Sequence, residues 1–159
     1  MTNVLRPVFA PALTVLTVSA CAPASPPPSD FAQDRAEIEG VITDYEQAVN
    51  DGDLEAAVGI FSPDAVFMPA GGPAQRGIDA IRAYYQDVIL QSPLQLGFTV
   101  GGVEIVGDLA WATAEIDGIQ TTPDGTENPV AVNGLFVWHR DPTAGRWRVV
   151  AYMFTPAGT

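Results

Sequence analysis

The order of two hydrophobic patterns constrains the fold of this chain most. Before Pro93, apolar residues recur at three- and four-residue steps, which is the spacing of amphipathic helices. After Pro93, apolar and polar residues alternate through long segments separated by short turns, which is typical of an antiparallel meander of strands. Helices followed by such a meander predict an α+β fold, with the helices packed on one face of a sheet.

The helical part of the pattern has identifiable boundaries. Asp30 and Gln33 resemble a capping box before the first apolar stripe. That stripe ends at Asn50-Asp51-Gly52, and Asp53 is expected to cap a second, short helix. The expected helices are residues 31–50, a short helix carrying Leu54, Val58 and Phe61, and residues 78–91; a turn at Ser62-Pro63-Asp64 leads into a short strand over Ala65–Met68.

The strand patterns contain glycines where a side chain would normally pack. Glycine inside a strand often marks a bulge or a bend, so the sheet is predicted to be curved. The strands are expected over residues 98–106, 109–120, 128–140 and 147–154, with Gly101, Gly102, Gly118 and Gly134 inside them.

The first twenty residues are typical of an export signal and are not expected to join the fold. Arg6 precedes an apolar run that is too short to span a bilayer as a helix. The stretch VSAC, ending at Cys21, resembles a bacterial lipobox, and Cys21 is the only cysteine of the chain. We therefore expect a lipoprotein-type signal peptide over residues 1–20, with Cys21 lipidated and the protein anchored in the bacterial cell envelope. The alternative is an ordinary signal peptide cleaved after Ala22, which would release a soluble periplasmic or secreted protein.

Residues 21–30 are rich in proline and serine and are expected to form a tether, so the folded domain is predicted over residues 31–156. The formal net charge of the chain is −12, and all seven basic residues are arginine. An acidic surface repels phosphate backbones and anionic headgroups, so nucleic acid is not expected as a partner. Contact with a membrane is expected only through the lipid anchor.

Three phrases of the sequence carry a resemblance to a known superfamily. They are YEQAVNDGDLEAAVGIFSPDAVF, RGIDAIRAYY and FVWHRDPTAGRWRVV, and with the element order they cover about residues 31–155. The chain resembles the nuclear transport factor 2-like superfamily, in particular its SnoaL-like branch, which is related to ketosteroid isomerase. This resemblance implies a cone-shaped antiparallel sheet (a cystatin-like fold) wrapped around three helices, with a mostly apolar pocket at its open end. It also implies homodimers formed through the outer face of the sheet.

The resemblance to ketosteroid isomerase allows a test of catalytic residues. Such an enzyme uses a carboxylate to move a proton, together with a tyrosine and a protonated aspartic acid as oxyanion donors. Tyr45 matches the tyrosine. The base position falls at Met68 or Pro69 and the second donor near Gly134, and none of these side chains can do that chemistry. The isomerase mechanism is therefore not supported in that form.

The same alignment predicts which side chains form the pocket. Alternation along the last two strands turns one face of each toward the cavity, and the first helix contributes its tyrosine. The expected pocket residues are Tyr45, Phe61, Met68, Trp111, Phe136, Trp138, Val150, Tyr152 and Phe154.

The direction of residues 109–120 stays open, because one face carries alanines and the other carries Trp111 and Glu115. If Trp111 and Glu115 point inward, Glu115 is a buried carboxylate with a raised pKa, suited to acid–base catalysis. If they point outward, Trp111 belongs to the dimer surface and Glu115 is solvated. The candidate catalytic residues are therefore Tyr45, Tyr152 and Glu115.

Three functions follow from these alternatives. The first is a small-molecule-binding domain for an apolar or carbonyl-bearing ligand, and the second is an isomerase, cyclase or dehydratase that uses Tyr45 or Tyr152 with Glu115. The third is a non-catalytic dimerisation module, favoured if aromatic side chains fill the cone. His139 is the only histidine and ends a strand, so we expect it at the surface and expect no metal site. The sequence also lacks a glycine-rich dinucleotide-binding pattern, so no cofactor is expected.

Overall fold

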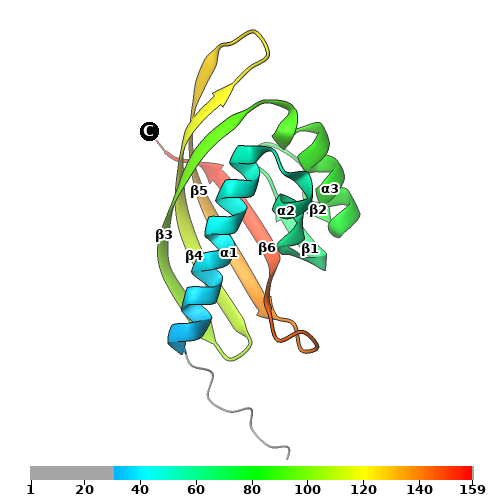
Figure 1. Ribbon diagram of the computed structural model, residues 1–159, viewed down its shortest axis with the longest axis vertical. Coiled ribbons are helices and arrows are strands. Elements are labelled where there is room, and N and C mark those ends of the chain that lie inside the picture. The colour runs from blue at the N-terminus through cyan, green and yellow to red at the C-terminus, as the bar shows by residue number, and fades with distance from the viewer. Residues whose placement is uncertain (1–30, 159) are drawn as a thin grey trace, which may run out of the picture.

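The computed structural model describes residues 31–158 (Figure 1). The predicted signal peptide, tether and lipidation site at Cys21 lie outside the described residues. Along the chain the elements are α1 (Phe31–Asp51), α2 (Leu54–Gly59), β1 (Phe61–Met68), β2 (Gln75–Arg76), α3 (Ile78–Asp87), a 3-10 turn η1 (Ile89–Gln91), β3 (Leu94–Val106), β4 (Leu109–Thr121), β5 (Glu127–Arg140) and β6 (Trp147–Pro156).

Six strands form one curved, open sheet in the order β2-β1-β6-β5-β4-β3. Strand β1 pairs in parallel with β6, and the other neighbours pair antiparallel. Helix α1 lies along the concave side of the long strands, and α2 and α3 lie beside it near β1 (Figure 1). The predicted α+β fold, a curved sheet around three helices, is confirmed.

Several boundaries differ from the prediction. Phe61 leaves the second helix and opens β1, because the Val149 amide donates to the carbonyl of Ile60 and draws this segment onto β6. The third helix ends at Asp87, and Val88 separates it from η1. Strand β3 begins at Leu94, four residues before the expected start, since its first residues pair with the end of β4.

Glycines permit the curvature of the long strands. The register of β3 against β4 shifts between Val100 and Val103, which places a bulge at Gly101-Gly102 as predicted. At Gly118 of β4, a Cβ atom would overlap the carbonyl oxygen of Gln95 on β3. Only glycine allows the two backbones to approach this closely.

The core lies between α1 and the concave face of the sheet. Helix α1 contributes a stripe that includes Ile38, Ile42 and Tyr45, and β5 contributes the fully buried rings of Phe136 and Trp138. Burial of one such large apolar side chain contributes about 1.5–3 kcal/mol. The first turn of α1 is held at the narrow end of the cone by the following polar contacts. Asp34 forms a buried ion pair with Arg140 and accepts a hydrogen bond from Trp147 Nε1 at 3.3 Å, while the Arg140 guanidinium lies 4.5 Å from the centre of the Trp147 ring.

None of the helices within residues 31–158 has the length and apolar character that crossing a membrane requires.

Candidate functional site

A cavity of about 220 Å³ occupies the wide end of the cone, between α1, α3 and the sheet. Its wall is apolar apart from tyrosines and one glutamine. The lining residues are Tyr45, Val49, Phe67, Tyr85, Val88, Ile89, Leu94, Leu96, Ile116, Gln120, Val130, Val132, Tyr152 and Phe154.

Three tyrosine hydroxyls converge at this cavity from three different elements. Tyr45 on α1 and Tyr85 on α3 place their hydroxyl oxygens 2.6 Å apart. The ring of Tyr152 on β6 meets that of Tyr45 edge-on, with the ring centroids 6.0 Å apart. We call Tyr45, Tyr85 and Tyr152 the tyrosine cluster. Tyr45 is the central member, because it contacts both of the others.

Burial raises the pKa of all three hydroxyls well above the ordinary value of tyrosine. The main cause is the loss of hydration, which penalises the phenolate, and the neighbouring tyrosines add to it through charge repulsion. Each hydroxyl therefore stays protonated at neutral pH. The tyrosine cluster is a set of neutral hydrogen-bond donors and acceptors in an apolar wall.

Aromatic packing holds the tyrosine cluster in place. The ring of Tyr45 meets Phe98 and Phe136 edge-on, with centroid distances of 5.6 and 6.0 Å. The ring of Tyr152 stacks on Phe136 at 4.0 Å and lies over Gly134. A Cβ atom at position 134 would lie 3.2 Å from Tyr152 Cε2 and 3.2 Å from Ile116 Cδ1. Gly134 thus leaves the space that the Tyr152 ring fills.

Five of the predicted pocket residues lie in or directly beneath the cavity. Tyr45, Tyr152 and Phe154 line the cavity. Phe136 and Trp138 lie beneath it, fully buried against the tyrosine cluster and the narrow end of the cone. Those two rings fill the narrow end of the cone, and the cavity occupies the wide end.

Trp111 and Glu115 lie on the outer face of β4, not in the pocket. The buried residues of β4 are the alanines at 110, 112 and 114 with Ile116, and the alternate residues are exposed. The Trp111 residue is 44% exposed. The inward alternative for this face is therefore wrong. The short alanine side chains face inward because they leave room for the core rings and for α1.

Met68 and Val150 were predicted to line the pocket, and the structure places both outside it. On β1, Phe67 is buried against Tyr152, so Met68 points away from the core and is 37% exposed. On β6, the register against β5 shifts between Val137 and Trp138. This bulge turns Val149 inward and moves Val150 to the wall of an outer groove. A bulge adds one residue to a strand, so an alignment without gaps predicts the wrong face beyond it.

Phe61 is buried as expected, with its ring 6.0 Å from that of Tyr85, but it borders the outer groove and does not line the cavity. Sequence reasoning missed Phe67, Tyr85 and Gln120 as cavity residues. Tyr85 lies in the helix predicted over residues 78–91, and its helical spacing from Ile78 and Ile81 is the signal that marks it as inward-facing.

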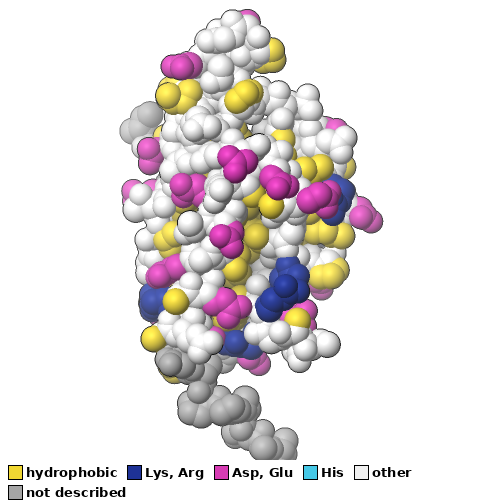
Figure 2. Space-filling view, viewed as in Figure 1, with side chains coloured by type: hydrophobic (Ala, Val, Ile, Leu, Met, Phe, Trp, Pro, Cys, Tyr) yellow, Lys and Arg dark blue, Asp and Glu magenta, His cyan; other side chains and the backbone are white. Residues whose placement is uncertain are grey.

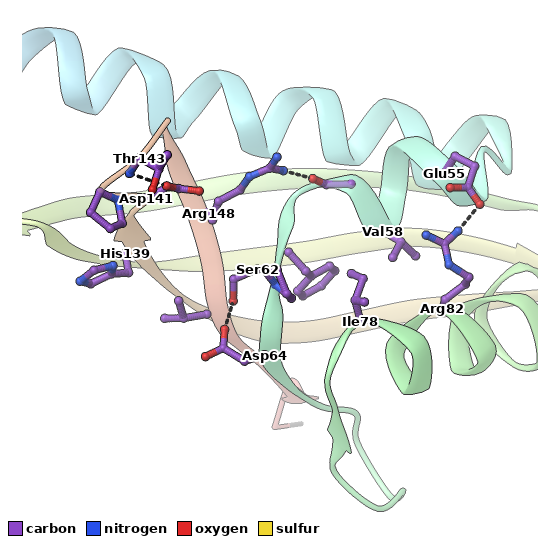
Figure 3. A pocket seen from close by; sticks show the side chains of 15 residues that line it. Glu55, Val58, Ser62, Asp64, Ile78, Arg82, His139, Asp141, Thr143 and Arg148 are labelled. Carbon is purple, nitrogen blue, oxygen red and sulfur yellow. Dashed lines mark hydrogen bonds and ion pairs between the residues drawn. The ribbon is translucent and has the colours of Figure 1, made fainter. Parts of the chain in front are cut away.

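The outer groove is larger, about 630 Å³, and its wall combines charged and apolar side chains (Figure 3). Its charged side chains are committed to protein partners. Arg82 pairs with Glu55, Arg148 donates to the carbonyl oxygen of Gly59, and Ser62 Oγ donates to Asp64 at 3.0 Å (Figure 3). His139 lies on the groove wall and is exposed, as predicted. We therefore place the candidate binding site in the cone cavity.

Charge is scarce at the cone cavity. None of its lining residues is Asp, Glu, Arg or His. Carboxylates are instead spread over the molecular surface, as the face bearing α1 shows (Figure 2). Within residues 31–158, no group of three or more His, Cys, Asp or Glu residues is arranged to hold a metal ion. The geometry suits an uncharged ligand that accepts or shares hydrogen bonds with the tyrosine cluster.

The fold is found in solved structures of other proteins. A ketosteroid isomerase-like protein from Erwinia carotovora atroseptica is 25% identical, with a TM-score of 0.74, and the match covers 81% of this chain and 100% of that one. A nuclear transport factor 2-like superfamily protein from Salmonella enterica serovar Typhimurium is 21% identical, with a TM-score of 0.73 and coverage of 81% and 95%. A putative dehydratase from Streptomyces avermitilis is 18% identical, with a TM-score of 0.72 and coverage of 80% and 99%.

No curated protein matches the sequence. A family model for the SnoaL-like domain matches residues 42–150, which run from the middle of α1 into β6 and include the whole tyrosine cluster except Tyr152. The chain therefore belongs to the SnoaL-like domain family, with a nuclear transport factor 2-like fold.

Proposed function

We propose that this domain binds a small, uncharged, mostly apolar molecule that carries a carbonyl or similar oxygen. The observation that carries the proposal is the tyrosine cluster, three protonated hydroxyls at an apolar cavity. Three hydroxyls have three protons, and the hydrogen bond between Tyr45 and Tyr85 uses one of them. Two protons and several oxygen lone pairs are left for a ligand.

The volume and the wall limit the ligand further. A dry cavity of about 150 Å³ in another protein holds benzene, so about 220 Å³ suits a molecule of one or two rings. A carboxylate ligand would find no cation in the wall, and an amine would find no anion. Burial of an unpaired charge is costly, which selects against both classes.

The enzyme alternative requires a general base at the cavity, and the structure does not favour it. Glu115 faces away from the cavity, and no other carboxylate or histidine lines the wall. The tyrosine cluster can stabilise an oxygen that gains negative charge, but general-base catalysis needs a group that takes a proton near neutral pH. A purely structural module is also disfavoured, because the aromatic rings fill only the lower part of the cone.

Ligand binding can be tested with 2-acetylnaphthalene, an uncharged two-ring ketone whose fluorescence depends on its surroundings. We expect saturable binding to the folded protein. The Tyr45→Phe variant removes the central hydroxyl and should weaken binding about 2- to 12-fold, the range for one neutral hydrogen bond. Tyr84→Phe is the matched control, because Tyr84 does not line the cavity. The proposal fails if the wild-type protein does not bind this ketone, or if the two variants lose affinity equally.

We further propose that the protein is exported and anchored in the cell envelope through a lipid on Cys21, supported by the signal-like residues 1–20 and the VSAC stretch. Metabolic labelling with an alkyne fatty acid should mark the wild-type protein and not Cys21→Ser. Equal labelling of both would reject the anchor.

We also propose a homodimer formed through the outer face of the sheet. Trp111 on this face neighbours Val137 of β5, which in turn neighbours Ala151 of β6. This row gives the outer face an apolar centre, and apolar area of this kind favours association.

A further inference from the structure

Among the described residues, Gln120 is the only polar side chain that lines the cone cavity outside the tyrosine cluster. It lies near the end of β4, on the same inward face as Ile116, between Leu94 of β3 and Asn128 of β5. In the part of the chain that the structure describes, no hydrogen bond to its side-chain amide is found. A half-buried amide in an apolar wall is a donor and acceptor that a ligand can satisfy.

Gln120 lies farther along β4 than the residues nearest to Tyr45. The ring of Tyr45 is packed on Phe98, and Phe98 pairs directly with Ile116 of β4. Gln120 is four residues beyond Ile116, about 13 Å farther along an extended strand. A ligand that lies along β4 would therefore meet the tyrosine cluster and the Gln120 amide at different points along its length.

The rest of the cavity wall is apolar. Leu94 and Leu96 on β3 and Val130 and Val132 on β5 line it. A ligand that reaches from the tyrosine cluster to Gln120 must therefore have an apolar middle. A polar group placed there would lose its hydration without gaining a partner.

We propose that the ligand class is an elongated, uncharged compound of about two rings with a polar group at each end. This inference rests on the binding function proposed above. One end carries an oxygen held by the tyrosine cluster, and the other carries a hydroxyl, carbonyl or amide that pairs with Gln120. Gln120 is thus the residue that distinguishes a ligand with two polar ends from one with a single polar end.

The test compares two probes, 2-acetylnaphthalene and 2-acetyl-6-hydroxynaphthalene, which differ only by a hydroxyl at the end remote from the ketone. Wild-type protein should bind the hydroxylated probe about fivefold more tightly, the effect of one neutral hydrogen bond. Gln120→Leu should abolish that preference, so that its affinities for the two probes agree within about twofold. Gln95→Leu is the matched control, because Gln95 is exposed on the outer face at the same end of the sheet.

The outcomes separate this inference from the proposed function. If the wild-type protein binds both probes equally, or if Gln120→Leu keeps the preference, the role of Gln120 is rejected and ketone binding stands. If neither probe binds, the proposed function is rejected and this inference with it. Retention of the preference in Gln95→Leu, together with its loss in Gln120→Leu, supports the assignment.

Discussion

At the scale of single residues, the site depends on one glycine and one ring. Gly134 sits where the isomerase pattern has its second donor, and the ring of Tyr152 covers the space above it. No larger residue fits at position 134 without a shift of its neighbours, because an added Cβ atom would lie 3.2 Å from both Tyr152 and Ile116. The hydroxyl donors of this cavity therefore come from Tyr85 and Tyr152 beside Tyr45, and not from an acid on β5.

The raised pKa of the tyrosine cluster predicts how stability depends on pH. The unfolded chain releases its tyrosine protons near pH 10, whereas the folded protein holds them to higher pH. The folded state then binds more protons than the unfolded state, so stability is retained below pH 10 and falls as pH rises above it.

Urea unfolding at pH 8, 9, 10 and 11 measures this dependence. The free energy of unfolding should fall between pH 10 and pH 11, and Tyr85→Phe should fall less steeply because one of the buried hydroxyls is gone. Parallel curves for the two proteins above pH 10 would contradict the assignment of the slope to the tyrosine cluster.

At the scale of elements, strand β4 decides which chemistry the cavity can have. The alanine face of β4 points inward, and the face with Trp111 and Glu115 points outward. Glu115, the carboxylate proposed as a base, is therefore exposed to solvent. The bulge in β6 acts in the same way, since it exchanges Val150 for Val149 in the core. These two choices of face determine which side chains of β4 and β6 can reach the core and the cavity.

The inward alanine face of β4 predicts a difference between neighbouring positions. Ala112 is fully buried and pairs with Phe136, so Ala112→Leu should overpack the core and lower the free energy of unfolding by about 1–3 kcal/mol. Thr113→Leu, one residue along on the exposed face, should change it by less than about 0.5 kcal/mol. Urea denaturation of both variants is the measurement, and a larger loss in Thr113→Leu would overturn the orientation of β4.

At the scale of the whole molecule, the cavity and the start of helix α1 lie at different ends of the domain. Helix α1 begins at the narrow end of the cone, where Asp34 pairs with Arg140, and its last turns reach the cavity at Val49 (Figure 1). The outer face of the sheet is separate from both. A dimer formed there would leave the cavity mouth open to ligand.

The proposed homodimer gives the whole-molecule prediction. Trp111→Ser should remove the largest apolar side chain from the outer face and shift the protein from dimer to monomer, with the cavity intact. Phe31→Ser is the control, because Phe31 is also exposed and aromatic but lies at the start of α1. Light scattering after size-exclusion chromatography gives the mass, and a wild-type monomer, or an unchanged mass for Trp111→Ser, would reject this interface.

The sequence by itself determined the class of fold, the order of helices and strands and the bulge at Gly101-Gly102. These follow from periodicity, turn residues and side-chain chemistry, all of which are local. Tyr45 and Tyr152 were also identifiable, because each lies on a stripe that the pattern turns inward.

Only the tertiary structure decided which residues share the cavity. The 2.6 Å contact between Tyr45 and Tyr85 joins residues 40 positions apart, and no local pattern encodes it. The faces of Trp111, Glu115 and Val150 were settled by packing against other elements, since a strand has two faces and a bulge exchanges them. The physical reason is that burial depends on what covers a face, and that cover comes from distant parts of the chain.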